Sequence, residues 1–473
     1  MKRVEGGRTP LRLYNTLTRQ VENLQFKESN GEPTVNIYCC GPTVYRDAHI
    51  GNLRTFLLAD LARRALEFAN FKVDLVQNIT DVGHMSEDFE EDKILAQSKT
   101  ESRDPFDIAR DYESKFHTDC RAINIKPARL YPRASETIDL MIDAIDELLR
   151  KEIAYLGEDN SIYFAAEKFP TYGALSGNRL DALQPGHRYE FTEGGAKRFH
   201  ADWALWKSAG NRREMIWETP WGPGFPGWHI ECTAMSLKYL NGQIDLHVGG
   251  IDLRFPHHEN ERAQSNSLIG EEAVSLWLHG EHLLFEGRKM SKSAGNVVLV
   301  RDLITRKISP LTLRFCFMEN RYRSQMDLSW SALIAAHNLL NRWRKNYQLW
   351  LASPAHQSPA VKELTEAIAQ DFYEDLDTPQ AVIKLRSIEK SELSAGEKRA
   401  IFENVDQLFG LELLHEIADE ALPEVAVALL KEREAARTAR DFAKSDRLRD
   451  ELEKIGISVK DSKDGQEWSW LPR

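Results

Sequence analysis

The sequence predicts an α/β protein in which a parallel sheet is followed by a mainly helical region. Residues 34–40 are rich in β-branched and aromatic side chains, and residues 71–79 form a second such run. Between them, from about residue 53, apolar residues recur every three to four positions, which predicts a helix. A strand–helix–strand unit of this kind is typical of parallel sheets. Beyond about residue 329 the helical periodicity becomes dominant.

The elements between these two regions follow from local composition. Gly41 and Pro42 end the first strand, and strand-like residues return at 244–250. The segment from about 110 to 220 mixes a helical stretch at 134–151 with turns rich in glycine and proline. Its position predicts an insertion between two halves of a nucleotide-binding, Rossmann-like fold.

The remaining elements complete the predicted order. Residues 283–288 fit a hairpin with its turn at Glu286 and Gly287. A charge-laced helix begins near residue 424, ends at Gly456 and precedes a short strand. One face of the helix after residue 329 is apolar: Leu333, Ala336, Leu340, Trp343 and Tyr347. The predicted divisions are the first half of the Rossmann-like domain at 1–120, a connecting insertion at 121–220, the second half at 221–328, a helical domain at 329–420 and a small mixed tail at 421–473.

Composition is that of a globular protein with a large core. The chain has 473 residues, of which 42% are hydrophobic and 29% charged, and its mean hydropathy is −0.48. No run is long enough to cross a membrane, and the first residues lack the apolar stretch of a signal peptide. The five cysteines are too scattered for a disulfide framework, so we expect a cytoplasmic protein. The net charge of −11 does not indicate nucleic-acid binding by the whole chain, but a phosphate backbone responds to local patches.

Two short runs predict a phosphate-binding site. His49-Ile50-Gly51-Asn52 stands where the first strand meets the first helix, a place where backbone N–H groups can bind phosphate. Lys289-Met290-Ser291-Lys292-Ser293 places two lysines and two hydroxyls in a short loop, which suits the stabilisation of a polyphosphate as charge moves. Taken singly, the first run could be a capping turn with an incidental histidine, and the second a basic surface loop.

Four scattered residues offer metal ligands. His257 and Glu261 follow Pro256 and stand four positions apart, so they share one face of a predicted helix. Cys40 ends the first strand, and Cys232 follows a tight turn. Two thiolates, an imidazole and a carboxylate suit zinc. From spacing alone these residues could equally belong to the core or the surface, because they form no compact zinc-finger pattern.

The last segment combines basic and acidic residues on one predicted helix. The basic residues are Arg433, Arg437, Arg440, Lys444, Arg447 and Arg449. By composition alone, this pattern is typical of a solvated helix with ion pairs between residues four positions apart.

Five motifs, in order along nearly the whole chain, resemble the cysteinyl-tRNA synthetase family, which belongs to the class I aminoacyl-tRNA synthetases. The motifs span residues 38–45, 78–82, 227–232, 249–261 and 289–293. The resemblance implies a Rossmann-like catalytic domain with a connecting insertion, then a mainly helical domain and a small anticodon-binding tail. Asn52 departs from the family pattern, in which a histidine is usual at this position.

The resemblance also implies roles for individual residues. The zinc ligands would be Cys40, Cys232, His257 and Glu261. The catalytic residues would be His49, Asn52, Lys289 and Lys292, and the ATP contacts Gly41, Thr43, Gly51, Gly249, Asp252 and Lys292. Thr80 and Trp228 would lie around the bound amino acid, and the anticodon contacts would be Arg437, Asp446, Arg449, Asp461 and Trp468. No role follows for Cys39, Cys120 and Cys316, or for the acidic stretch 86–92.

The activity implied by the resemblance is cysteine–tRNA ligation. Cysteine and ATP, with Mg²⁺, would give cysteinyl-adenylate and pyrophosphate, and the adenylate would then esterify the 3′ end of cysteine tRNA. One zinc ion per chain would select the substrate thiolate, and we expect a monomer without membrane contact. Two alternatives stay open: a ligase that passes the adenylate to an amino-sugar, as in mycothiol biosynthesis, and a catalytically silent relative that binds RNA or senses metal. Such amino-sugar ligases lack the anticodon end, so the presence of residues 437–468 argues against an amino-sugar ligase. The presence of the lysines and of all four metal ligands argues against a catalytically silent relative.

Overall fold

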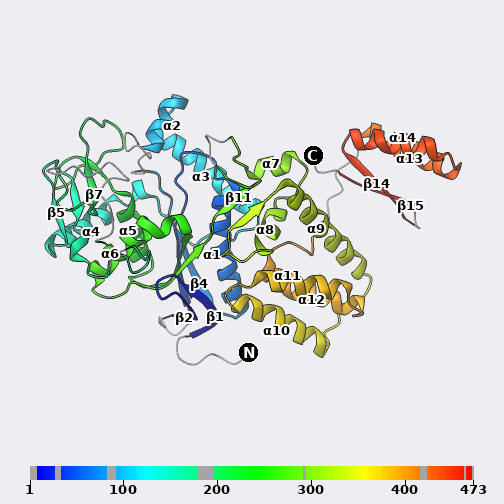
Figure 1. Ribbon diagram of the computed structural model, residues 1–473, viewed down its shortest axis with the longest axis horizontal. Helices are drawn as coiled ribbons and strands as arrows, with labels where there is room; N and C mark the ends of the chain where they lie inside the picture. Colours follow the sequence, from blue (N-terminus) through cyan, green and yellow to red (C-terminus); the bar gives the residue numbers. More distant parts are fainter. Residues whose placement is uncertain are drawn as a thin grey trace.

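The computed structural model describes residues 8–26, 34–82, 92–178, 180, 196–290, 295–415, 423–462 and 465–470. Figure 1 shows a central sheet with the insertion (β5, β7, α4) and the neighbouring helices α5 and α6 on one side, and the helices α9 to α12 on the other. The helices α13 and α14 lie at the edge of the molecule, beyond α9 (Figure 1). None of the helices in the described ranges is long and apolar enough to cross a membrane.

A four-stranded parallel sheet forms the centre of the molecule. Strand β3 (Thr34–Cys39) pairs with β4 (Lys72–Gln77) on one side and with β9 (Ile244–Gly250) on the other, and β9 pairs with β10 (Val274–Gly280). Helix α1 (Ile50–Phe68) connects β3 to β4. The strand order β10-β9-β3-β4 therefore brings strands from beyond the insertion next to the first strand. The predicted Rossmann-like sheet, interrupted by an insertion, is confirmed.

Helix α1 begins at Ile50, three residues before its predicted start, because His49 caps it. The imidazole of His49 accepts hydrogen bonds from backbone N–H groups of the first turn, which have no partner within the helix. Most of α1 is buried between the sheet and the helical region. The buried residues of α1 include its predicted apolar face from Leu53 to Ala65.

The insertion contains a separate antiparallel sheet. Its strands are β5 (Ala154–Leu156), β6 (Ile162–Phe164), β7 (Trp203–Ser208) and β8 (Gly224–Pro226), in that order. The helices around it are α2 (Lys93–Glu101), α3 (Pro105–Ala122), α4 (Ile138–Arg150), α5 (Trp228–Tyr239) and α6 (Glu259–Ile269). The helical stretch predicted at 134–151 is a single turn followed by α4. Strand β8 lies a few residues past the predicted end of the insertion at 220, while the division into domains stays a prediction.

Two small sheets flank the central one. Strands β1 (Arg8–Asn15) and β2 (Gln20–Gln25) form an antiparallel pair, and β11 (Leu283–Phe285) pairs with β12 (Arg288–Lys289) and with β13 (Met326–Leu328). The predicted hairpin turn is confirmed, since Glu286 and Gly287 have positive φ angles of 51° and 73°.

The helical region packs on the far side of α1. Its helices are α7 (Val300–Thr305), α8 (Leu311–Met318), α9 (Trp330–Trp350), α10 (Pro359–Tyr373), α11 (Thr378–Lys390) and α12 (Ala395–Phe409). The predicted apolar face of α9, from Leu333 to Tyr347, is buried in the same core as α1. Cys39, Cys120 and Cys316 are also buried in this core, so they have a packing role.

The last segment differs from prediction, because two helices replace the single one that was expected. Helices α13 (Glu424–Thr438) and α14 (Phe442–Lys454) are separated by a turn in which Arg440 has a φ of 58°. The strands β14 (Ile457–Ser462) and β15 (Gly465–Trp470) then form a hairpin. The turn lets both helices bury apolar residues in one small core, whereas a continuous helix would leave that face exposed.

Candidate active site

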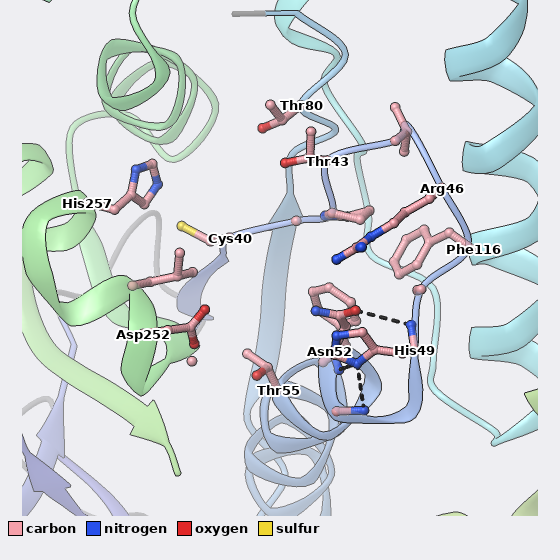
Figure 2. Close-up of a pocket in the computed structure, with 18 of the residues that line it drawn as sticks. Cys40, Thr43, Arg46, His49, Asn52, Thr55, Thr80, Phe116, Asp252 and His257 are labelled. Atoms are coloured by element: carbon pink, nitrogen blue, oxygen red, sulfur yellow. Dashed lines mark hydrogen bonds between the residues drawn. The ribbon is translucent and has the colours of Figure 1, made fainter. Parts of the chain in front are cut away.

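A cavity of about 980 Å³ lies at the carboxyl ends of the parallel strands, next to the first turn of α1. Figure 2 shows Cys40, Thr80, Asp252 and His257 around this cavity, with residues 49–52 (the His49 loop) on the opposite side. The predicted site residues that line it are Cys40, Gly41, Thr43, His49, Gly51, Asn52, Thr80, Trp228, Cys232, Asp252, His257 and Lys289. Lys292 lies outside the described residues. The fold thus gathers predicted residues that are far apart in the sequence, as expected for a ligand site at the edge of a parallel sheet.

The His49 loop presents neutral hydrogen-bond donors to the cavity. Nδ1 of His49 accepts hydrogen bonds from the backbone N–H of Gly51 at 3.1 Å and of Asn52 at 3.3 Å, and the His49 N–H donates to Oδ1 of Asn52 at 3.1 Å (Figure 2). Burial, with a smaller effect of the nearby Arg46 charge, lowers the pKa of His49 to about 4. The imidazole is therefore neutral at pH 7, and the hydrogen-bond pattern assigns its proton to Nε2.

A close backbone contact requires glycine at position 41, and side chains crowd the position of Gly51. A Cβ on Gly41 would lie 1.6 Å from the backbone oxygen of Asn78, and a Cβ on Gly51 would lie 3.0 Å from the His49 ring. Gly249 is not among the residues that line the cavity. A Cβ there would lie 2.3 Å from the ring of His258, so the missing side chain makes room for that histidine, and the predicted nucleotide contact of Gly249 stays a prediction.

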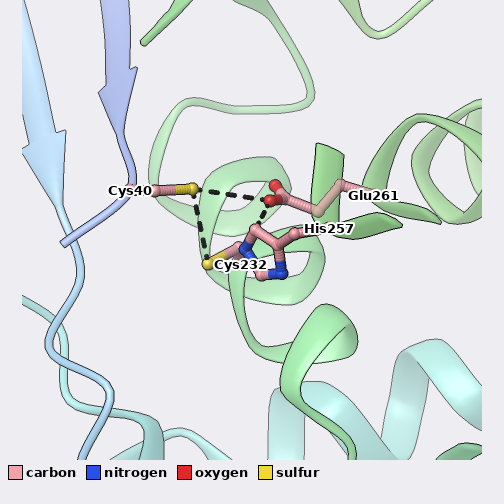
Figure 3. A group of neighbouring side chains, drawn as sticks. All are labelled: Cys40, Cys232, His257 and Glu261. Carbon is pink, nitrogen blue, oxygen red and sulfur yellow. Dashed lines mark hydrogen bonds and ion pairs between the residues drawn. The ribbon is translucent and has the colours of Figure 1, made fainter. Parts of the chain in front are cut away.

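The four predicted metal ligands come together at the closed end of the cavity. Figure 3 shows Cys40, Cys232, His257 and Glu261 facing one another, and all four are buried with their ligand atoms within 4.8 Å. Sγ of Cys40 lies 3.9 Å from Sγ of Cys232 and 3.4 Å from Oε1 of Glu261, which is 2.8 Å from Nε2 of His257. Two sulfur ligands of a tetrahedral zinc ion would stand about 3.8 Å apart, so this donor set fits zinc.

The local structure that places these ligands differs in part from prediction. Cys40 does follow the first strand, but Cys232 lies within helix α5 rather than after a turn. His257 precedes α6, in a segment where Phe255 has an extended backbone, while Glu261 lies in the first turn of the helix. The predicted contact between His257 and Glu261 is present even though a regular helix does not span both.

The electrostatics of the cluster call for a cation. Burial, followed by the proximity of Cys232, raises the pKa of Cys40 well above its usual range, and burial does the same to Glu261. For Cys232 the effect of burial is outweighed, and hydrogen bonding with Cys40 contributes to a lowered pKa. A divalent cation would compensate the negative charge that these buried donors carry when deprotonated, and would therefore favour that form.

A chain of histidines under the cluster was not predicted. Nε2 of His247 and of His258 lie 3.5 Å and 3.3 Å from Sγ of Cys40, so both histidines are alternative ligand candidates. Nδ1 of His258 lies 2.8 Å from Nε2 of His279, and Nδ1 of His279 lies 2.8 Å from the hydroxyl of Thr16. The available signal was that His247 lies in the strand predicted at 244–250, whereas His279 lies in β10, a strand that was not predicted.

Trp228 adjoins the cluster and Thr80 lines the same cavity, while their predicted place around an amino acid stays a prediction. The Trp228 ring stacks on His257 with centroids 4.2 Å apart. The hydroxyl of Thr80 accepts a hydrogen bond from the Asn78 amide at 3.1 Å. Both residues line the cavity beside Cys40 and Cys232.

The predicted anticodon residues form a second group, away from the cavity. The Asp461 carboxylate pairs with Arg433, Arg437 and Arg449 at 2.9 to 3.0 Å. The other members, Asp446 and Trp468, lie on α14 and β15; Asp446 is 3.4 Å from Arg449, and Trp468 packs against the small core. Arg433 is buried, and the partly exposed Arg437 and Arg449 are matched by Asp446 and Asp461, so this group is a network of ion pairs rather than a basic patch.

The acidic stretch from 86 to 91 lies outside the described residues, but its neighbour Asp92 has a structural role. Asp92 caps helix α2 and pairs with Arg212 at 3.2 Å. This pair joins α2 to the sheet of the insertion.

Sequence comparisons agree with this arrangement of a catalytic part and a small C-terminal unit. Residues 26–338 match the family model described as "tRNA synthetases class I (C) catalytic domain", and residues 419–468 match "Cysteinyl-tRNA ligase anticodon binding domain". A cysteine–tRNA ligase of Thermus thermophilus is 40% identical over 480 residues, covering 96% of this chain and 98% of that protein. One of Chlamydia caviae is 37% identical over 486 residues, covering 98% and 99%.

Solved structures support the fold. A Mycobacterium tuberculosis methionyl-tRNA synthetase bound by methionyl-adenylate superimposes with a TM-score of 0.55 at 13% identity, covering 87% of this chain and 96% of that one. At this identity the likeness concerns the fold alone. The two family models and the full-length relatives together show that the chain belongs to the cysteine–tRNA ligase family of class I aminoacyl-tRNA synthetases.

Proposed function

We propose that the protein activates L-cysteine with ATP, releasing pyrophosphate, and then esterifies the 3′ end of cysteine tRNA. The observation that carries this proposal is the position of the Cys40, Cys232, His257 and Glu261 cluster, which opens into the same cavity as the His49 loop. A metal-binding thiol site and a phosphate site in one cavity suit the joining of cysteine to a nucleotide. The reaction needs Mg²⁺ with ATP and takes place in the cytoplasm, on a monomer.

Zinc held by these four residues would supply a Lewis acid that binds the substrate thiolate far better than the hydroxyl of serine. Contacts with a hydrocarbon pocket alone would discriminate by only about 1–3 kcal/mol. Trp228, stacked on His257, and Thr80 would enclose the rest of the amino acid. The protein's own task in this part of the site is to orient the substrate carboxylate toward the nucleotide.

The nucleotide would bind along the other side of the cavity. Asp252, which lies beside Gly250, would accept a hydrogen bond from the ribose, and Gly41 and Thr43 would line the path of the chain past the nucleotide. The Nε2–H of His49 and the start of α1 would donate to phosphate oxygens. Lys289 and Lys292 would stabilise the charge on the leaving pyrophosphate.

The C-terminal unit would bind the anticodon. Arg437, Arg449 and Trp468 offer guanidinium and indole planes on which unpaired bases can stack, and the exposed Asp446 can accept a base amino group. Asp461, whose carboxylate is shared by arginines, would act mainly by fixing Arg437 and Arg449 in place.

The metal assignment is tested by Cys232→Ala, with Cys316→Ala as the matched control. Both cysteines are buried, but Cys316 lies in the core away from the cluster. Wild type should contain about one zinc ion per chain, because four donors complete one tetrahedral set. The Cys232 variant should lose zinc and cysteine-dependent ATP–pyrophosphate exchange together, whereas the control should keep both. A Cys232 variant that retains zinc and normal exchange would contradict the assignment of the metal ligands. Exchange by the wild type without charging of cysteine tRNA would favour the amino-sugar ligase.

A further inference from the structure

The side of the cavity that faces away from the metal ligands carries positive charge. Figure 2 shows the guanidinium of Arg46 pointing into the cavity, on the side of His49 and Asn52. Lys93 and Lys289 line the same cavity. In the described ranges, these three are the lysine and arginine side chains that line it, and the acidic side chains that line it are Asp47, Asp252 and Glu281. Of these, Asp252 lies on the side of the metal ligands (Figure 2).

The residues of the His49 loop contribute no formal charge themselves. With a pKa of about 4, His49 is neutral at pH 7. The amide oxygen of Asn52 accepts the hydrogen bond from the His49 N–H, so this side chain is partly committed to capping the helix. The loop therefore offers neutral donors and the positive end of the α1 dipole, but no full positive charge.

Arg46 supplies such a charge, and the neighbouring carboxylate does not neutralise it. Asp47 pairs with Arg301 at 2.8 Å. Within the described part of the chain, Arg46 contacts an aromatic ring rather than a carboxylate: its Cζ lies 5.0 Å from the centroid of Tyr45. Nζ of Lys93 lies 5.7 Å from the same centroid, so two cations share one ring at the cavity.

The lowered pKa of His49 is a second indication that the positive charge of Arg46 acts inside the cavity. After burial, the charge of Arg46 is the largest influence that lowers the pKa of His49. A phosphate group bound at the start of α1, within hydrogen-bond reach of His49, would experience the same positive charge as an attraction.

We propose that Arg46 binds the β- and γ-phosphates of ATP and stabilises the pyrophosphate as it leaves. This inference rests on the proposed function. In that reaction a carboxylate oxygen of cysteine forms a bond to the α-phosphorus, the bond between the α-phosphorus and the bridging oxygen breaks, and pyrophosphate leaves with the electron pair. A guanidinium suits this task because its planar donors can bind two phosphate oxygens at once.

The test is Arg46→Ala in the full-length protein, with Arg46→Lys as the conservative variant. Arg46 is exposed at the cavity, so the substitution removes no core packing. We expect kcat/KM for ATP in cysteine-dependent pyrophosphate exchange to fall about 100-fold, as when one preorganised donor is removed. The KM for cysteine and the zinc content should not change. Inhibition by added pyrophosphate should weaken, while binding of AMP, which lacks the β- and γ-phosphates, should be unaffected; Arg46→Lys should restore part of the loss.

Arg213→Ala is the matched control, because Arg213 is an exposed arginine that donates to backbone carbonyls outside the cavity. Normal ATP and pyrophosphate parameters for Arg46→Ala would overturn the inference. So would normal exchange combined with slow transfer from preformed adenylate to tRNA, since Arg46 would then bind phosphates of the tRNA acceptor end. Absence of exchange in wild type would refute the proposed function itself, which separates that failure from one confined to Arg46.

Discussion

A buried charge cluster joins the helix that begins at the phosphate site to the helical region. Oδ2 of Asp60, on α1, lies 2.7 Å from Nε of Arg64 and 2.7 Å from a guanidinium nitrogen of Arg314, on α8. Its Oδ1 accepts a hydrogen bond from the backbone N–H of Lys126 at 2.9 Å. All three charged side chains are almost completely buried, and Asp60 is in direct contact with both guanidinium groups.

Asp60→Ala should therefore lower the free energy of unfolding strongly. Removing one partner of a buried ion pair leaves uncompensated charge and costs about 3–5 kcal/mol. Asp111→Ala is the control, because Asp111 pairs with Lys115 at 3.0 Å where both side chains are exposed to solvent. An exposed pair contributes about 0–1 kcal/mol, so the two variants should be clearly separated in urea denaturation at pH 7, followed by far-UV circular dichroism.

The pH dependence gives an independent check of the same reasoning. Burial acts to raise the pKa of Asp60, but Arg314 and Arg64 outweigh it and hold the pKa below its usual value. A depressed pKa stabilises the fold above the unfolded-state value of about 3.9, and this stabilisation is lost as the pH falls through the folded-state value. The difference between wild type and Asp60→Ala should be constant from about pH 7 to pH 5 and should shrink below about pH 4. An effect no larger than that of Asp111→Ala would refute the reasoning, as would a difference that persists unchanged in acid.

Three further substitutions test the proposed sites. Lys292→Ala should slow adenylate formation by orders of magnitude, with the fold and cysteine binding intact, because its charge is needed mainly in the transition state; a near-normal exchange rate would contradict this role. Removal of residues after 422 should preserve pyrophosphate exchange but sharply reduce tRNA charging. Asp446→Ala should mainly relax discrimination against an anticodon-altered tRNA. Equal charging of cysteine tRNA and of the anticodon-altered tRNA by the full-length protein would argue against anticodon reading. Gly41→Ala should cost activity and about 1–3 kcal/mol of stability, because its Cβ would lie 1.6 Å from the Asn78 backbone oxygen; wild-type thermal stability and exchange would show that the loop adapts freely.

Features that depend on neighbours along the chain could be predicted from the sequence. The apolar face of α9 was predictable because residues three and four positions apart lie on one side of a helix. The turn at Glu286 and Gly287 was predictable because a two-residue hairpin needs positive φ angles. The motifs around Cys40 and His257 also allowed the metal ligands to be named through resemblance to a family, although spacing alone left them open.

Tertiary structure decided the features that depend on strand order and packing. Cys40 and Cys232 stand 192 positions apart, on the C-terminal side of β3 and on α5, and the fold brings them together next to the paired strands β3 and β9. The same pairing places His247 near Cys40, a contact that no local pattern indicates. The turn at Arg440 likewise depends on the small core that α13, α14 and β14 share. The ion pair between Arg433 and Asp461 joins elements that pack around this core. Local periodicity predicts which face of a helix or strand is apolar. Contacts between distant residues depend on how these faces pack together, and the free energy of that packing depends on the whole fold.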